Sequence, residues 1–342
     1  MADYNINERW SMFDRAKASP DGKSVLPIIN TLNLKVDDFF KDVPLKVCNR
    51  GLSLVFRRKN EMTASENIVP YYGIKPTKMG TQLVTEHVVK KGRLRSIAED
   101  ELDGLDEGAR KSELRSQDEA HIRQLGEDGV YAFWHGGIAE DSSNIRGLYD
   151  RLSALNTSGL NNVLSLGNAN ASYNSSIYIV EWQIDFGCFG LIPSSWMGHG
   201  PLGVKSVNEG RVKTVNPNDV ERTYMALDAR HNLYTGLAVG DNLKIARLAN
   251  INTDENGSNN FISGYGSRKL YKLLENGHFD LSRTRIYINP DLSTQLQILG
   301  DEKGNLSLSS VEVFGRRVNA FRNIPVRVID RVIIPSTETV VV

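Results

Sequence analysis

Few groups of residues in this chain have the types and spacing that catalysis or cofactor binding requires. Residues 198–203 read Gly-His-Gly-Pro-Leu-Gly, the G-x-G-x-x-G form of a loop that holds a dinucleotide phosphate. Such a loop must follow a strand directly and open a helix. Here residues 193–196 intervene before the loop, and residues 204–207 have an extended pattern after it. The sequence therefore disfavours a dinucleotide site.

Two other patterns lack a residue on which their chemistry depends. Residues 252–257 begin like a calcium-binding loop, but Ser263 stands at the twelfth position, where a bidentate Glu is needed. A polar turn is the favoured interpretation. Residues 135–137, His-Gly-Gly, resemble the oxyanion loop of an esterase, but the chain holds no G-x-S-x-G segment to supply the nucleophile.

The cysteines and histidines do not form ligand sets either. Cys48 and Cys188 are far apart and have no neighbouring base in the sequence, so they indicate neither a disulfide scaffold nor a thiolate nucleophile. Five histidines stand singly, without a second His or Cys at ligand spacing: His87, His121, His199, His231 and His278. We therefore expect no catalytic residue, no cofactor, no metal ion and no enzyme activity.

The charges of the chain balance, with 41 Lys and Arg against 41 Asp and Glu in 342 residues. A zero net charge argues against a protein that grips nucleic acid through a large basic surface. The apolar runs are too short to cross a bilayer, and the first residues lack the regions of a signal peptide. We expect no membrane association and synthesis in a reducing cytoplasm.

An alternating pattern predicts two strands, at residues 52–56 and 82–90, after a short amphipathic helix at residues 25–40. We interpret residues 46–95 as one long hairpin. Its basic residues include Arg57, Arg58, Lys59, Lys75 and Lys78. A hairpin without a third strand is only marginally stable in water, so it needs a surface of this chain or of another copy.

Residues 97–128 are highly charged and predict one long helix or two broken ones. Ala98, Leu102, Leu105 and Ala109 have helical spacing, while two glycines reduce the helix propensity of the segment. The acidic residues include Glu99, Asp103, Asp106 and Glu113. They form either a solvated helix face or a face that receives the basic hairpin of a neighbouring copy, a contact that opposite charges on one chain would favour.

The rest of the chain mixes predicted strands and helices without a βαβ alternation, so the fold class is α+β. Residues 156–176 have the composition of a surface loop. Strands are expected at residues 177–182, 189–193, 236–239, 243–251, 285–290 and 326–334, and helices at 267–275 and 291–299, the second capped by Asp291. Hairpin turns are expected at residues 301–305 and 322–325.

Several short blocks, in their order along the chain, resemble the major capsid proteins of tailed bacteriophages, specifically the podophage-type family. The blocks are residues 133–136 (Phe-Trp-His-Gly), 147–153 (Gly-Leu-Tyr-Asp-Arg-Leu-Ser), 176–182, 190–193, 234–241, 247–251, 287–290 and 324–326, with Asp330. Their succession from residue 133 to residue 334 carries the resemblance, because no single block is specific.

The resemblance implies the Hong Kong 97-like (Johnson) capsid fold, with circular permutation as an option. Its parts would be an N-terminal arm (1–45), the E-loop hairpin (46–95), a peripheral domain with a spine helix (96–170), an axial domain (171–300) and return strands of the peripheral domain (301–342). The implied function is a structural major capsid protein. Its copies would self-assemble, as pentamers and hexamers, into the icosahedral head shell around phage double-stranded DNA, in the cytoplasm of the host bacterium.

The resemblance also implies partners and contact residues. We expect a separate scaffolding protein, because no long extension precedes the apparent fold, a portal, and a decoration protein as a further candidate. The candidate contacts between subunits are Arg57, Arg58, Lys59, Lys75, Lys78, Glu99, Asp103, Asp106 and Glu113. The alternatives are an encapsulin-like bacterial shell protein and an intracellular enzyme of unrecognised class, which would need a pocket with convergent titratable groups.

Overall fold

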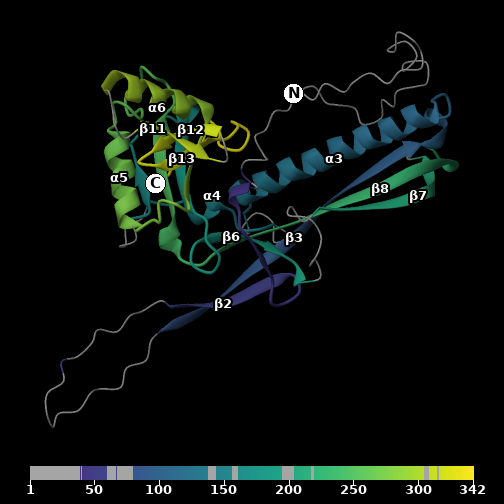
Figure 1. Ribbon diagram of the computed structural model, residues 1–342, viewed down its shortest axis with the longest axis horizontal. Coiled ribbons are helices and arrows are strands. Elements are labelled where there is room, and N and C mark those ends of the chain that lie inside the picture. Colours follow the sequence, from purple (N-terminus) through teal and green to yellow (C-terminus); the bar gives the residue numbers. More distant parts are fainter. Residues whose placement is uncertain are drawn as a thin grey trace. The chain divides into compact units, whose positions relative to one another are not determined.

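The computed structural model describes residues 39, 41–59, 67, 80–137, 144–155, 161–194, 204–216, 219–303, 308–313 and 316–342 (Figure 1). The chain divides into two units. The small unit is Met1–Asn33, Lys90–Gly129 and His199–Leu233, and the large unit is Leu34–Val89, Val130–Gly198 and Tyr234–Val342. Strand β3 (Thr81–Ala98), helix α3 (Glu107–His135) and strand β8 (Asp219–Val239) contribute residues to both.

The small unit combines a hairpin, the end of β3 and most of the polar helix α3. Strand β7 (Val204–Asn216) pairs antiparallel with β8 over almost its whole length. The buried side chains of Arg95 and His231 both contact Asp118 of α3. Arg95 Nε lies 3.1 Å and His231 Nε2 lies 2.9 Å from Asp118 Oδ1. Charged contacts therefore help to hold the helix on the strands of this unit.

One sheet has the strand order β1-β6-β8-β3-β2, and β7 pairs with β8 outside this path. Its further strands are β1 (Leu45–Val47), β6 (Cys188–Ile192) and β2 (Ser53–Lys59). Strand β2 pairs antiparallel with β3, from Ser53↔His87 to Lys59↔Thr81. The predicted hairpin thus has its third strand, β8, and β2 forms the edge of the sheet.

The second sheet of the large unit has the order β11-β12-β13-β10-β5-β9-β4. The strands are β4 (Val163–Ser165), β5 (Asn174–Glu181), β9 (Ile245–Asn252), β10 (Thr284–Ile288), β11 (Leu308–Val313), β12 (Arg316–Phe321) and β13 (Ile324–Val328). The helices of this part are α4 (Leu148–Arg151), α5 (Gly266–Asn276) and α6 (Pro290–Lys303). Strand β5 is buried along its whole length, because apolar clusters cover both faces of the sheet.

The two clusters differ in what they pack against the sheet. Leu270 of α5 and Leu292 of α6 belong to one cluster, together with Ile179 of β5. Trp134, at the end of α3, belongs to the other cluster, together with Tyr178 of β5 and Val341 near the C-terminus. The alternating side chains of one strand therefore join both halves of the core.

Most of the elements predicted in the C-terminal half are confirmed. The strands predicted at residues 177–182, 189–193 and 285–290 correspond to β5, β6 and β10, and the helix at 267–275 is α5. The turn at 322–325 is also confirmed. Arg322 and Asn323 have φ angles of 51° and 64°, as the two central residues of a tight hairpin between β12 and β13 require.

The predicted helix at residues 97–128 begins too early and ends too early. Strand β3 continues to Ala98, a 3-10 turn follows at Glu99–Glu101, and α3 begins only at Glu107. Ala98, Leu102 and Leu105 therefore do not share a helix face. The first helical hydrogen bond outside this turn runs from Arg110 N to Asp106 O, at 2.8 Å. At its other end, α3 takes in the apolar residues 130–134, because all of them except Tyr131 pack into the core.

The expected cap of α6 is also wrong. Asn289, not Asp291, caps the helix, since Leu292 N donates to Asn289 Oδ1 at 2.9 Å. Pro290 occupies the first position of α6, where its missing N–H costs nothing, and Asp291 lies in the first turn. The hairpin expected at residues 301–305 is wrong for residues 301–303, which continue α6.

Two more expectations need correction. The strand expected at residues 326–334 ends at Val328, because the carbonyl of Asp330 accepts from Ile333 N and Ile334 N and closes a turn. The loop expected at residues 156–176 contains strand β4, which pairs in parallel with β9. The helix expected at residues 25–40, apart from Phe39, and the glycine loop at 198–203 lie outside the described residues.

We predict that Trp134→Ala lowers the free energy of unfolding by about 3–5 kcal/mol, because it removes a buried ring from the core. The Trp134 ring is 1% exposed and lies 4.8 Å from the Tyr178 ring and 5.4 Å from the Tyr287 ring, between centroids. Urea unfolding of the unassembled protein measures the change. Tyr131→Ala, on the same helix but 47% exposed, is the matched control and should change stability by less than about 1 kcal/mol. Equal losses in the two variants would contradict this packing.

Candidate functional site

The predicted basic contact residues lie on the β2–β3 hairpin, where neighbouring residues point to opposite faces. Arg57 is exposed and stands opposite Leu83, which is 63% exposed. Arg58 belongs to the other face, where its Nε donates to Gly240 O at 2.9 Å and its Nη2 donates to Val239 O at 2.6 Å. Lys59 is the last residue of β2, and Lys75 and Lys78 lie outside the described residues.

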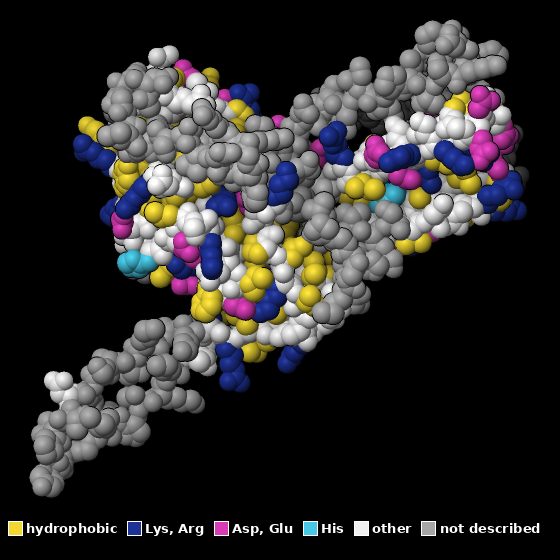
Figure 2. Space-filling view, in the orientation of Figure 1, with side chains coloured by type: hydrophobic (Ala, Val, Ile, Leu, Met, Phe, Trp, Pro, Cys, Tyr) yellow, Lys and Arg dark blue, Asp and Glu magenta, His cyan; other side chains and the backbone are white. Residues whose placement is uncertain are grey.

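The predicted acidic residues lie in the small unit, near the turn between β3 and α3. Acidic side chains gather at this end of the unit (Figure 2). Asp103 and Asp106 are exposed. Glu99 already pairs with Arg110, at 3.5 Å, and with Arg211, and the buried Glu113 accepts from Gln117. Asp103 and Asp106 are therefore the two predicted acidic residues that are exposed and that form no ion pair with a described residue.

The outer edge of β2 is closed at one end by a side chain. Asn49 Nδ2 donates to Val55 O at 2.8 Å, and Val55 N donates to Asn49 Oδ1 at 2.9 Å. The amide of Asn49 therefore occupies the place of a neighbouring strand. Ser53 exchanges two backbone hydrogen bonds with Arg50 on the same edge.

The same edge is open further along β2. Strand residues alternate the direction of their backbone polar groups, so Arg57 directs its N–H and C=O to the side that Ser53 and Val55 use. The bond from Val88 N to Leu52 O agrees with this alternation, since it places the even-numbered residues of β2 toward β3. No described residue bonds to the outward backbone groups of Arg57. An added strand could therefore pair there.

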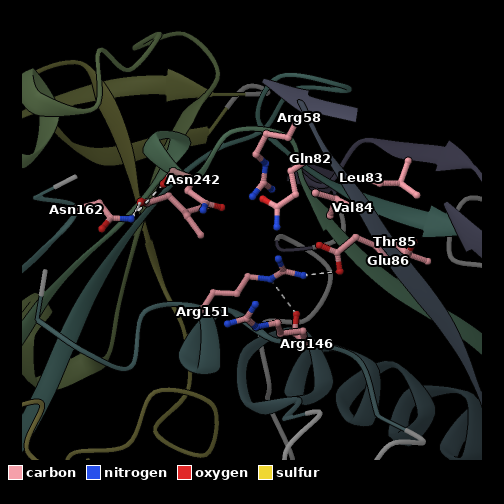
Figure 3. Close-up of a pocket in the computed structure, with 11 residues that line it drawn as sticks. Arg58, Gln82, Leu83, Val84, Thr85, Glu86, Arg146, Arg151, Asn162 and Asn242 are labelled. Atoms are coloured by element: carbon pink, nitrogen blue, oxygen red, sulfur yellow. Dashed lines mark hydrogen bonds and ion pairs between the residues drawn. The ribbon is translucent and has the colours of Figure 1, made fainter. Parts of the chain in front are cut away.

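The other face of the hairpin lines a cavity of about 420 Å³ in the large unit. We call it the arginine pocket, after Arg58, Arg146 and Arg151. Glu86 supplies the carboxylate of its wall, and amide groups complete it. The side chains of Arg58 and Gln82 point from the hairpin toward Arg151 (Figure 3).

The pocket joins residues of separate segments through polar contacts. Arg151 Nη2 donates to Glu86 Oε2 at 2.8 Å, and the two side chains are only 7% and 8% exposed. Arg151 Nε donates to Arg146 O at 3.1 Å. Burial lowers the pKa of Arg58, and the positive charge of Arg151 lowers that pKa further, while the negative charge of Glu86 raises it. The guanidinium groups are thus close enough to repel one another.

A buried ion pair holds the wall that carries Arg151. Arg247 of β9 and Glu338 have side chains 0% and 1% exposed, and Arg247 Nη2 donates to Glu338 Oε2 at 2.9 Å. Arg247 Nη1 also donates to Leu152 O, at 3.0 Å, directly after Arg151. Arg247 Nε donates to Ser176 Oγ, at 3.0 Å, so the guanidinium is bound on several sides. The chain around Arg151 is therefore tied to the sheet and to the C-terminal residues.

A second buried carboxylate anchors the chain before β1. Asp42, whose side chain is 1% exposed, accepts from Arg327 Nε at 2.9 Å and from Arg285 Nε at 3.2 Å. These arginines lie on the paired strands β13 and β10. Tyr287 lies beside them, and burial raises the pKa of its hydroxyl well above the ordinary value.

The described cysteines, histidines and carboxylates form neither a reactive thiolate nor a metal-binding cluster. Burial raises the pKa of Cys48 to about 11 and that of Cys188 to about 12, so neither is a ready thiolate nucleophile. Among the described ranges, no group of three His, Cys, Asp or Glu side chains could hold a metal ion. His135 Nε2 lies 2.5 Å from Ile333 O, a structural contact. In the same part of the chain, no helix is long and apolar enough to cross a membrane.

No motif or charge pattern in the sequence identifies Asn49, Glu86, Arg146 or Arg151 as site residues. Arg151 belongs to one of the blocks that carry the family resemblance, but that block says nothing of its partner. Glu86 of β3 stands 65 positions away from Arg151 of α4, and the two side chains meet only in the tertiary structure. A sequence offers no direct signal for such a pair.

Comparison with known proteins shows the family to which this chain belongs. The sequence model of the family Major capsid protein GP7 matches residues 19–342. The chain belongs to this family. It is a structural, shell-forming protein of the phage virion and not an enzyme, as the sequence predicts. Family membership thus decides against both the encapsulin-like and the enzyme alternatives.

Solved structures similar to this capsid protein include that of bacteriophage Epsilon15, at 18% identity and a TM-score of 0.67, covering 100% of this chain and 99% of that chain. This likeness confirms the predicted Hong Kong 97-like fold. The bacteriophage JBD30 capsid has 12% identity and a TM-score of 0.47, covering 92% of this chain and 97% of that chain. The SrpI encapsulin of Synechococcus elongatus PCC 7942 has 9% identity and a TM-score of 0.43, covering 70% of this chain and 95% of that chain. A search of curated proteins found no match.

We predict that Glu338→Gln lowers the free energy of unfolding by about 3–5 kcal/mol, because it leaves the buried Arg247 without a counter-charge. Urea unfolding of the unassembled protein measures the loss. The control is Glu119→Gln, which removes the carboxylate of an exposed pair, Arg115–Glu119, and should cost less than about 1 kcal/mol. A neutral effect of Glu338→Gln would show that the Arg247–Glu338 pair does not hold the fold.

Proposed function

We propose that copies of this capsid protein close into an icosahedral shell of pentamers and hexamers, and that the open edge of β2 is a joint between copies. The observation that carries the proposal is the partly closed edge: Asn49 satisfies Val55, whereas the next outward-facing residue, Arg57, has no described backbone partner on that side. A strand of a neighbouring copy would supply the missing hydrogen bonds.

The surroundings of Arg57 support such a contact. Leu83 stands opposite Arg57 and is 63% exposed, so a neighbour would also bury apolar area. The exposed Asp103 and Asp106 are candidate counter-charges for Arg57 in another copy. Single exposed pairs contribute about 0–1 kcal/mol, but every copy in a closed shell repeats them.

We further propose that the shell encloses phage double-stranded DNA without sequence-specific contacts. The balance of 41 basic and 41 acidic residues supports this, because an inner surface with a strong positive field would bind the genome tightly. A separate scaffolding protein, a portal and a decoration protein are proposed partners. The assignment of residues 46–95 to the E-loop, 96–170 to the peripheral domain with its spine helix and 171–300 to the axial domain also remains a proposal.

The test replaces Arg57 by proline, which has no N–H to offer an added strand. The N–H of Arg57 points away from β3, so Arg57→Pro should leave the pairing of β2 with β3 intact. We predict that shell yield, counted by negative-stain electron microscopy, falls by about fivefold or more, the equivalent of one lost backbone hydrogen bond for each contact.

Arg57→Ala is the matched control, since it removes the charge but keeps the N–H. It should assemble better than Arg57→Pro, and thermal unfolding should show that both variants fold. Shells of Arg57→Pro at the wild-type yield would refute the role of the edge. Monomers or dimers of the wild-type protein, expressed with and without its adjacent reading frames, would refute the shell.

A further inference from the structure

The arginine pocket has more hydrogen-bond donors than its own acceptors use. Three guanidinium groups, of Arg58, Arg146 and Arg151, line it, whereas Glu86 is the one carboxylate of the lining and Asp150 pairs with Arg146 from outside the lining. Arg58 uses Nε and Nη2 for backbone carbonyls, and Arg151 uses Nε and Nη2. No described residue accepts a hydrogen bond from Nη1 of either side chain. Each Nη1 carries two N–H donors.

The surplus donors are held in fixed places. Arg151 is bound to Glu86 and to Arg146 O, and Arg247 fixes the chain directly after it. Arg58 is fastened to two carbonyls at the end of β8 and to β3 through the hairpin. On the opposite wall, Asn162 Nδ2 donates to Asn242 O at 3.1 Å and to Ile245 O at 3.2 Å. A rigid set of donors is what recognition of an anion requires.

We propose that the arginine pocket binds a carboxylate side chain of a second copy of this chain, supplied by residues 99–107. This inference rests on the proposed shell and names the contact that the pocket makes in it. Guanidinium groups bind carboxylates through two parallel hydrogen bonds, and Arg58 and Arg151 present their donors from opposite sides of the cavity (Figure 3). The incoming carboxylate would also relieve the repulsion between the guanidinium groups.

The chain itself indicates the source of the carboxylate. Its net charge is zero, so an excess of basic groups in one place is matched by an excess of acidic groups elsewhere. Residues 99–107 hold six carboxylates and no basic residue. Four of these acidic residues are exposed, Asp100, Asp103, Asp106 and Glu107. In a shell built of identical copies, every pocket has such a turn available from a neighbour.

A nucleic acid fits the pocket less well. A duplex carries about one charge per 1.7 Å along its axis and calls for a row of cations on an open surface. The three arginines instead converge in a cavity of about 420 Å³, and Glu86 and the nearby Asp150, which accepts from Arg146, would repel a chain of phosphates. A single carboxylate meets less repulsion there.

The test places the photo-crosslinker p-benzoylphenylalanine at Gln82, an exposed residue that points into the pocket. Isotope-labelled and unlabelled protein are mixed, assembled into shells, irradiated and digested. Mass spectrometry then identifies the crosslinked peptides. We expect a peptide that contains residues 99–107 from the other copy. The crosslinker at Tyr265, which is 62% exposed and does not line the pocket, is the matched control and should not capture residues 99–107.

Several outcomes would overturn the inference. Crosslinks within one copy would show that residues 99–107 of a neighbour do not enter the pocket. Crosslinks to another segment of a neighbour, or to packaged DNA, would show that the pocket has a different occupant. Such results in shells that form normally would leave the proposed shell intact. A failure of the unmodified protein to form shells would overturn both.

Charge variants provide a second measurement. Arg146 lies at the rim, with its side chain 49% exposed, so Arg146→Gln should not disturb folding. We expect assembly to slow by about tenfold, as the loss of one charge-assisted hydrogen bond predicts, and Arg146→Lys to recover part of the rate.

Asp103→Asn combined with Asp106→Asn should slow assembly similarly, and adding Arg146→Gln to that pair should have little further effect. Strictly additive losses would contradict a direct contact. Arg115→Gln, on the exposed side of α3, is the control.

Discussion

The structure depends on the burial of the Arg247–Glu338 ion pair. Two charges removed from water are tolerated only when each has a partner and its remaining polar atoms are bonded, and the loss of one partner costs several kcal/mol. Here Ser176, Tyr178 and Leu152 complete the set of hydrogen bonds. Glu338 stands four residues before Val342, the last residue that the structure describes. The large unit can therefore satisfy Arg247 only when the C-terminal residues lie on the sheet and the chain beside Arg151 is in place.

This internal constraint contrasts with polar groups on the hairpin that have no described partner. Asn49 closes the edge of β2 at Val55, but the outward backbone of Arg57 and the Nη1 groups of Arg58 and Arg151 are not bonded to any described residue. Unpaired donors at an edge or in a cavity are a liability in a soluble monomer. In a shell-forming protein they are the expected sites of contact, since neighbouring copies can satisfy them.

The sequence patterns predicted well those helices, strands and turns that are determined by residues close together in the sequence. The buried strand β5 and the amphipathic helix α5 have clear periodicity, and the turn at Arg322 and Asn323 follows from a short polar break between apolar runs. The predicted start of α3 was wrong because Leu102, although buried, lies in the turn between β3 and α3 and not on a helix face. The arginine pocket could not be predicted, because Glu86 of β3 and Arg151 of α4 are distant in the sequence and meet only in the tertiary structure.

The most direct test of the account is a high-resolution cryo-electron microscopy map of the particles that the purified protein forms. We expect a closed icosahedral shell in which a strand of a neighbouring copy continues the sheet beyond β2 at Arg57. Density for a carboxylate of the neighbour should lie between Arg58 and Arg151. A shell in which the outer edge of β2 faces solvent and the pocket is empty would contradict the proposed contacts. Particles without icosahedral closure would contradict the account as a whole.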